Sequence, residues 1–247
     1  MCSTLFRGTD THPARRVPSH TALSPTDRAR CRGPTLCGVN LSAHAPAAYL
    51  AADDVIDADH PAVRDAAATL RAAHPGDVPF ARAAFELARD EIRHSCDAAD
   101  PRVTLRASDV LRDGVGLCFA KSHLLAAMLR AEGVPAGLCY QRLTDDGETF
   151  VLHGLVAVHL QDGWHRLDPR GNKPGVDAQF SLTSERLAWP VRVDLGERDY
   201  PQVLVAPDRD VVRALRGATN VLELCRGGLP SDLSTGSGAD AADVTSR

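Results

Sequence analysis

Asp113-Gly-Val-Gly-Leu-Cys-Phe-Ala-Lys-Ser-His-Leu-Leu-Ala-Ala-Met-Leu-Arg130 is the stretch that sets a cysteine between two glycines and an apolar segment. Gly114 and Gly116 favour a tight loop, and the apolar residues after Cys118 recur with the period of a helix. The pattern predicts a helix from about Leu117 to Gly133, with Cys118 in its first turn. A helix N-terminus carries about half a positive charge and free N–H groups, so it favours a thiolate over a thiol.

A nucleophilic cysteine needs an imidazole to hold its proton and a third group to orient that imidazole. His123 lies on the same predicted helix but about 140° around its axis from Cys118, so it cannot easily reach the sulfur. His153 lies near the start of a predicted strand and precedes Gly154, which leaves room for a close approach. Asp168 closes the following strand. The order Cys118, His153, Asp168 predicts a catalytic triad.

The strand period of two tests this pairing. A two-residue turn at Asp162-Gly163 sets Asp168 opposite Ala157, on the same face as His153 but about 13 Å away along the strand. Direct contact between the two side chains therefore requires a wider loop or a bulge that shifts the pairing by an even number of residues. His159 and His165 are interpreted as surface or core-edge histidines.

The remaining elements predict an α+β fold in which helices pack on an antiparallel β-meander. Helices are expected at Pro61 to Ala73 and from Val78 to about Arg93. Strands are expected at 137–143, 150–160 and 164–167, with turns at Asp145-Asp146-Gly147 and Asp162-Gly163. Weaker signals predict a short strand at 48–52, edge strands at 188–193 and 202–205, and a last helix at 207–216.

Composition divides the chain into three parts. Residues 1–45 are rich in Pro, Ser, Thr and Arg and are interpreted as a disordered leader. Residues 46–226 are expected to form a single domain, and residues 227–247 a disordered tail. The net charge of −4 and aromatic content of 4% argue against a nucleic-acid partner. No apolar run approaches the roughly 20 residues that a membrane-spanning helix needs, so we expect no membrane partner.

The seven cysteines are odd in number, scattered in spacing and free of any Cys-x-x-Cys pair. This pattern is typical of free thiols in a reducing compartment, and we expect a cytoplasmic protein. Cys96, Cys139 and Cys225 are interpreted as small buried hydrophobes. Because the chain has neither a complete Cys/His set nor an Asp-x-Asp-x-Asp-Gly loop, we expect no metal and no other cofactor.

Several fragments, taken in order, resemble the core of the transglutaminase-like superfamily, which comprises cysteine enzymes of papain-like architecture and includes bacterial transglutaminase-core proteins. They are Gly116-Leu-Cys118, the helix end Met128-Leu-Arg-Ala-Glu-Gly-Val-Pro135, His153 at a strand start, Trp164-His-Arg-Leu-Asp-Pro169 and the upstream helix Phe85 to His94. The resemblance covers roughly residues 80 to 172 and implies a papain-like α+β core with the cysteine at the N-terminus of its central helix.

The resemblance also implies roles for single residues. Cys118 is similar to the nucleophile, His153 to the general base and acid, and Asp168 to the orienting carboxylate. One departure is Leu155, because the family often has an aromatic residue two positions after the histidine. Gln141 is a candidate oxyanion donor, although the backbone N–H of Cys118 is the safer choice.

These residues predict a cysteine hydrolase or acyltransferase that acts on an amide, peptide or isopeptide bond. The thiolate attacks the carbonyl, an acyl-thioester forms, and water or an amine resolves it. The expected partner is therefore a peptide or amide substrate. The alternative is a binding module that kept the fold and lost turnover, which the missing aromatic residue favours.

Overall fold

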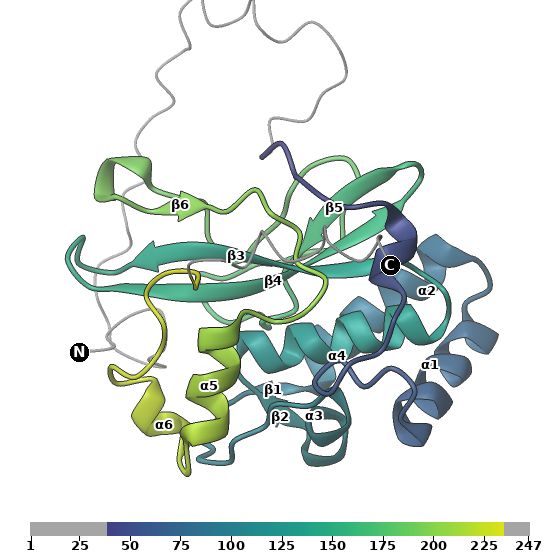
Figure 1. Ribbon diagram of the computed structural model, residues 1–247, viewed down its shortest axis with the longest axis horizontal. Helices are drawn as coiled ribbons and strands as arrows, with labels where there is room; N and C mark the ends of the chain where they lie inside the picture. Colours follow the sequence, from purple (N-terminus) through teal and green to yellow (C-terminus); the bar gives the residue numbers. More distant parts are fainter. Residues whose placement is uncertain (1–38, 235–247) are drawn as a thin grey trace, which may run out of the picture.

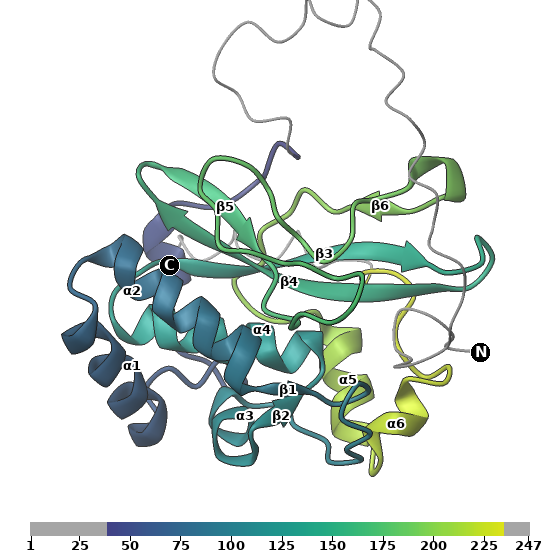
Figure 2. The ribbon, with the colours of Figure 1, turned by 180° about the vertical axis from the view of Figure 1, so that it is seen from behind.

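The computed structural model describes residues 39–234 and contains one four-stranded antiparallel sheet with the strand order β5-β4-β3-β6. The strands are β3 (Ala136–Thr144), β4 (Phe150–Leu160), β5 (Gly163–Leu167) and β6 (Arg198–Asp199). The helices gather on one face of this sheet (Figures 1 and 2). The α+β fold class predicted from the sequence is confirmed.

Six α-helices are found in the described part of the chain. They are α1 (Pro61–Ala73), α2 (Asp77–Glu86), α3 (Ala107–Asp113), α4 (Cys118–Ala131), α5 (Arg209–Gly217) and α6 (Val221–Leu224). A π-helical turn, Leu87–Glu91, continues α2, and the two-residue strands β1 (Arg93–His94) and β2 (Val115–Gly116) form a parallel pair. Within residues 39–234, every helix is too short or too polar to cross a membrane.

Helix α4 is the centre of the fold. It packs against β3 and β4 on one side and against α1, α2 and α3 on the other. Every residue from Cys118 to Arg130 is buried, as expected for a helix with apolar neighbours all round. The helix begins at Cys118 and ends just before Gly133, whose φ of +75° a glycine adopts without strain. The predicted helix is confirmed, although it faces helices as well as the sheet.

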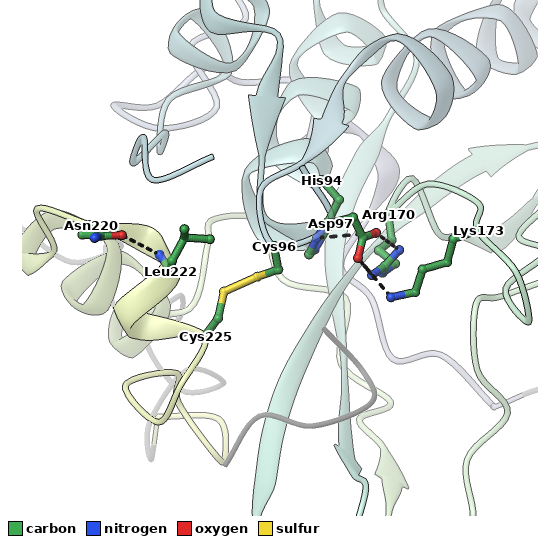
Figure 3. Close-up of a disulfide and its surroundings, with 8 residues drawn as sticks. All are labelled: His94, Cys96, Asp97, Arg170, Lys173, Asn220, Leu222 and Cys225. Carbon is green, nitrogen blue, oxygen red and sulfur yellow. Dashed lines mark hydrogen bonds and ion pairs between the residues drawn. A yellow bond between two sulfur atoms is a disulfide. The ribbon is translucent and has the colours of Figure 1, made fainter. Parts of the chain in front are cut away.

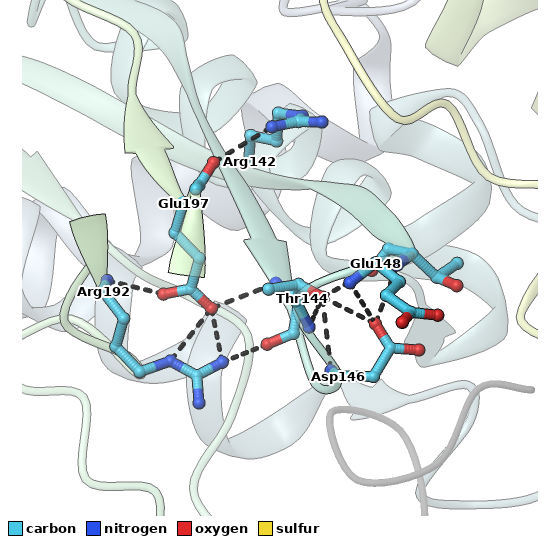
Figure 4. Close-up of polar contacts among 9 residues, drawn as sticks. Arg142, Thr144, Asp146, Glu148, Arg192 and Glu197 are labelled. Carbon is cyan, nitrogen blue, oxygen red and sulfur yellow. Dashed lines mark hydrogen bonds and ion pairs between the residues drawn. The ribbon is translucent and has the colours of Figure 1, made fainter. Parts of the chain in front are cut away.

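The hairpin between β3 and β4 follows the predicted turn at Asp145-Asp146-Gly147. The Asp146 carboxylate accepts the backbone N–H groups of Glu148 and Thr149, at 2.9 and 2.7 Å. At the base of the loop, Glu197 accepts the backbone N–H of Thr144 and pairs with Arg192 (Figure 4). These contacts tie the segment before β6 to the hairpin.

The turn between β4 and β5 differs from the prediction by one residue. The two turn residues are Gln161 and Asp162, both with positive φ (50° and 61°), and Leu160 pairs with Gly163. Two left-handed residues are the conformation of a type I′ hairpin, which matches the twist of the strands. Moving the turn by one residue moves the β4–β5 register by two, and this displacement decides where Asp168 lies.

Other expected elements also need correction. Residues 46–49 form a 3₁₀-helix rather than a strand, because Tyr49 turns into the core and its hydroxyl donates to the Val203 carbonyl at 2.9 Å. The expected edge strands at 188–193 and 202–205 are replaced by β6 and by an isolated bridge between Leu138 and Leu204. Helix α3, which the sequence did not predict, caps the loop before Cys118.

The expectation of free thiols is wrong for two cysteines, because Cys96 and Cys225 form a disulfide across 129 residues. Cys118 and Cys139 are the free, buried cysteines of the described residues. Spacing alone could not reveal the bond, because its partners come from distant segments. Cytoplasmic localisation stays a prediction, and it no longer has a set of free thiols to support it.

Contacts at both ends extend past the expected domain boundaries at residues 45 and 227. Ser42 donates its backbone N–H to the Pro201 carbonyl and accepts from Val203. At the other end, the Pro230 carbonyl accepts the backbone N–H of Leu152, and Ser234 bonds to Asp208. The rest of the predicted leader and tail, residues 1–38 and 235–247, lies outside the described residues.

Candidate active site

The loop before α4 delivers Cys118 to the first helical position. Gly114 ends α3 in the left-handed conformation, with a φ of +63°. Gly116 then passes so close to α4 that a Cβ there would lie 3.1 Å from both Ala120 Cβ and Thr104 Oγ1. The two glycines that the sequence singled out therefore each have a steric reason to be glycine, and together they aim the thiol from the helix N-terminus.

Gly154 brings β4 against the same turn. A Cβ at this position would lie 2.8 Å from Phe119 Cδ1 and 3.1 Å from the Phe119 Cα atom. Only a glycine allows this contact without displacing the helix. The neighbouring His153 is thereby held beside Cys118, which is among the groups that raise its pKa.

Asp168 reaches His153 because of the β4–β5 register. Leu167, the last residue of β5, pairs with Val156, so the next residue stands level with Leu155, two positions from His153 and on the same face. His153 Nε2 lies 2.9 Å from Asp168 Oδ2. The even shift that the sequence required is supplied by the Gln161-Asp162 turn. With Nε2 directed to Asp168, Nδ1 remains for Cys118.

Electrostatics favour a charged imidazole. Burial opposes the charge of His153 most strongly, but the charges of Asp168 and Cys118 and hydrogen bonds to both outweigh it and raise the pKa of His153 to about 10. Burial likewise opposes ionisation of Asp168, yet His153 and the backbone N–H groups of Ala188 and Arg170 lower the pKa of that carboxyl. The arrangement stabilises an imidazolium beside a carboxylate.

The three side chains are almost completely shielded from solvent. Cys118 is 1% exposed, His153 3% and Asp168 0%. A substrate carbonyl must approach the sulfur closely for attack, so this conformation is closed to a peptide.

Trp189 is a contact that sequence reasoning missed. The Trp189 ring meets the His153 ring edge-on, with 5.1 Å between the ring centroids. The Arg170 guanidinium lies 5.2 Å from the centroid of the Trp189 ring. An aromatic side chain therefore lies against the histidine although Leu155 occupies the position where the family often has one. Trp189 belongs to a loop without regular structure, and no periodicity in the sequence linked it to the site.

Arg170 and Lys121 are buried structural groups beside the site. Arg170 is fully buried, and its Nη1 pairs with Asp97 Oδ2 at 2.6 Å. Lys121 is also fully buried and donates to the carbonyls of Arg89, Ile92 and Arg170. Burial lowers the pKa of Lys121 to about 7, and the Arg170 charge adds to this effect. Both residues hold the segment after β5, which carries Asp168, against the helical layer.

Gln141 stands directly opposite His153 on β3, but its amide nitrogen donates to Asp199 at 3.0 Å. Its role as an oxyanion donor stays a prediction. Among the other histidines, His123 Nδ1 lies 2.8 Å from the Leu105 carbonyl, and His165 Nε2 lies 3.1 Å from that of Leu160. Within residues 39–234, His, Cys, Asp and Glu side chains form no group of three that could hold a metal ion.

Comparison with known proteins finds one family model that matches this core. The model of the transglutaminase-like superfamily matches residues 64–169, a segment that includes Cys118, His153 and Asp168. No curated protein matches the chain significantly.

Among solved structures, similarity is found to a putative cysteine protease from Cytophaga hutchinsonii, with 15% identity, a TM-score of 0.42 and coverage of 49% of this chain and 40% of that one. The periplasmic domain of TgpA from Pseudomonas aeruginosa has 26% identity, a TM-score of 0.35 and coverage of 44% and 42%. The chain thus spans less than half the length of either structure. The resemblance predicted from the sequence is confirmed for residues 64–169, which match the transglutaminase-like superfamily model.

Proposed function

We propose that this protein is a cysteine-nucleophile enzyme that cleaves or transfers the acyl group of an amide, peptide or isopeptide. The observation that carries the proposal is the arrangement of Cys118 at the start of α4, His153 beside it on β4 and the buried Asp168, whose Oδ2 lies 2.9 Å from His153 Nε2. A thiol, an imidazole and an orienting carboxylate in this order are the parts that thiol-based acyl transfer requires.

In the first step, the Cys118 thiolate attacks the substrate carbonyl and forms a C–S bond, and the carbonyl electron pair moves to oxygen. The backbone N–H of Cys118, at the helix N-terminus, is placed to donate to this oxyanion. The raised pKa of His153 keeps its imidazole protonated at neutral pH, so the ring is ready to act as an acid.

In the second step, the oxyanion re-forms the carbonyl, the C–N bond breaks and His153 gives its proton to the leaving amine. The product is an acyl-thioester on Cys118. Neutral His153 then takes a proton from water or from an acceptor amine, whose attack releases Cys118. Asp168 remains ionised and holds the imidazole in one orientation throughout.

Alkylation kinetics test the nucleophile directly. We expect iodoacetamide to modify Cys118 at least about tenfold faster than Cys139 at neutral pH, because thiolate is the reactive form. Cys139 is a suitable internal reference, since it is also buried and burial raises the pKa of its thiol to about 12. Mass mapping separates the two rates, and His153→Ala is expected to slow only the Cys118 reaction. Equal rates at both cysteines would refute the proposal.

A screen of amide and peptide substrates tests turnover, with Cys118→Ala as the control. The binding-module alternative is favoured by one observation, the near-complete burial of the thiol. Hydrolysis or amine transfer that disappears in Cys118→Ala would exclude that alternative.

A further inference from the structure

The outer edge of β4 is shared by three segments. Strand β5 pairs with β4 from Val156 to Leu160, and Asp168 follows directly after β5. Further along the same edge, the Leu152 backbone N–H donates to the Pro230 carbonyl at 2.8 Å. His153 and the thiol beside it therefore lie between the end of β5 and a segment from the C-terminal part of the chain. We refer to residues 226–234 as the C-terminal strap.

Side-chain contacts hold the strap over this edge. Leu229 packs against the buried Leu143, and Val151 on β4 and Trp189, which contacts the His153 ring, pack against the same residue. Asp232 accepts hydrogen bonds from Arg198 and from the Tyr200 hydroxyl. The strap thus lies on the backbone edge of β4 and shares a hydrophobic cluster with Trp189.

The disulfide fixes the start of the strap. Cys225 immediately precedes it and is bonded to Cys96. Asp97, the residue after Cys96, points toward Arg170 and Lys173 and forms ion pairs with both, at 2.6 and 3.0 Å (Figure 3). The strap therefore begins next to a disulfide, and ion pairs of Asp97 connect that disulfide to the loop after Asp168.

Two features make the strap an imperfect occupant. Pro230 offers a carbonyl to β4 but has no N–H to donate in return. The ion pair of Asp232 with Arg198 is about half exposed on both side chains (51% each), and such pairs contribute little stability. A peptide with an N–H at this position would form a bond that the strap cannot form.

We propose that the outer edge of β4 beside His153 is the subsite for an extended peptide acyl donor, and that the C-terminal strap occupies it as an intramolecular competitor. An exposed strand edge binds an extended chain through main-chain hydrogen bonds, and side-chain contacts beside it select the sequence. A peptide on this edge passes next to Cys118, where its carbonyl meets the thiolate. The inference rests on the function proposed above and names the class of substrate for that site.

Loosening the strap tests its position over the thiol. In Leu229→Ser/Asp232→Asn, we expect Cys118 alkylation by iodoacetamide to accelerate about tenfold, because the local opening of the strap that exposes the thiol then costs less free energy. Asp77→Asn is the matched control, since Asp77 also forms an ion pair with an arginine, Arg71, but lies on α2, on the opposite side of the molecule from the strap (Figure 1). Cys139 reports global loosening within the same molecule.

Acceleration of Cys118 with Cys139 unchanged supports the strap as a cover. An unchanged Cys118 rate, or an equal acceleration at both cysteines, would overturn it. Cys96→Ser/Cys225→Ser tests the anchor in the same assay, and we expect the same selective acceleration. The melting temperature of each variant is measured alongside, so that a folding defect is recognised as such.

A synthetic peptide with the sequence of residues 226–234 tests the subsite itself. Added to the loosened variant, it should slow Cys118 alkylation again in a saturable way, and a peptide of scrambled sequence should not. Equal protection by both peptides, or by neither, would contradict a peptide subsite on this edge. If the strap behaves as proposed but no peptide or amide is turned over, the enzymatic function fails while the subsite stands.

Discussion

Two histidines are almost completely buried in this core, yet their surroundings favour different charge states. His123, in the second turn of α4, faces the Leu105 carbonyl, and burial lowers its pKa to about 4. His153, on β4, faces Asp168 and Cys118, and its pKa rises to about 10. At neutral pH the first region holds a neutral ring and the second an imidazolium.

The difference shows that burial alone does not make a reactive histidine. In both regions, removal from water penalises the charged ring. A neutral carbonyl cannot offset that penalty at His123, whereas a buried carboxylate and a thiolate can at His153. The charge of Asp168, rather than the extent of burial, is thus the feature that distinguishes His153, a catalytic candidate, from His123, a structural residue.

Removing that charge should have the largest effect. In Asp168→Asn, we expect the rate of acyl transfer to fall by ~10³ to 10⁴, the loss seen when a triad carboxylate is replaced by its amide. The environment of His153 would then resemble that of His123. Because the pKa of His153 falls, the alkaline limb of the pH profile for acylation should move to lower pH. Steady-state kinetics against pH, or alkylation of Cys118 where no substrate is at hand, would measure both changes.

Asp199→Asn is the control for this experiment. Asp199 lies on β6 and is hydrogen-bonded to Arg166 and Gln141 rather than to His153. Its substitution should leave the pH profile where it is. A profile that is the same in Asp168→Asn as in wild type would show that the carboxylate does not set the charge of His153.

Helix α4 relates the two histidines, because it carries His123 and begins against β4 beside His153. Gly154→Ala would force a methyl group into Phe119, whose Cδ1 atom lies 2.8 Å from the new Cβ. We expect a loss of about 1 to 3 kcal/mol in the free energy of unfolding from overpacking. A displacement of the helix start by about 1 Å would also slow acyl transfer ~10²-fold.

Gly217→Ala is the matched control, since a Cβ at Gly217 meets nothing within 4 Å. Urea denaturation and the Cys118 alkylation rate should be measured on both variants. If Gly154→Ala and Gly217→Ala behave alike, β4 and α4 do not depend on that close contact.

Local signals in the sequence were sufficient for the elements that carry the site. Helix α4, β4 and the β3–β4 hairpin are specified by apolar periodicity and turn residues within each segment. The β4–β5 register was predicted with the correct parity but two residues off. Asp162-Gly163 is a typical turn pair, yet Gln161 and Asp162 take the two left-handed positions and Gly163 begins the strand.

The features that sequence reasoning missed depend on long-range contacts. Trp189 comes to His153 from an irregular loop, and Cys96 meets Cys225 from a segment 129 residues away. Lys121 is fully buried, although lysine is almost always exposed. Three backbone carbonyls from two distant segments, those of Arg89, Ile92 and Arg170, satisfy its ammonium group, and no local pattern predicts them.

The smallest expected effect is a difference in acid stability caused by His123. Its pKa is lower in the folded state, about 4, than the usual 6.5, so between these values the unfolded chain binds a proton that the folded chain does not. Stability therefore falls as the pH drops from about 6.5 to 4, and one pKa unit corresponds to about 1.4 kcal/mol. In His123→Gln, this part of the acid loss, about 1 to 3 kcal/mol, should disappear.

Urea denaturation at pH 7 and at pH 5 would measure the difference between wild type and His123→Gln. His94 is also buried with a lowered pKa, mainly through burial, so part of the acid dependence should persist in the variant. His153 contributes with the opposite sign, because its raised pKa makes stability fall as the pH rises from about 6.5 toward 10. His153→Gln should therefore flatten the alkaline side and leave the acid side unchanged. Variants that changed the same side of the curve would show that the two histidines do not differ in charge.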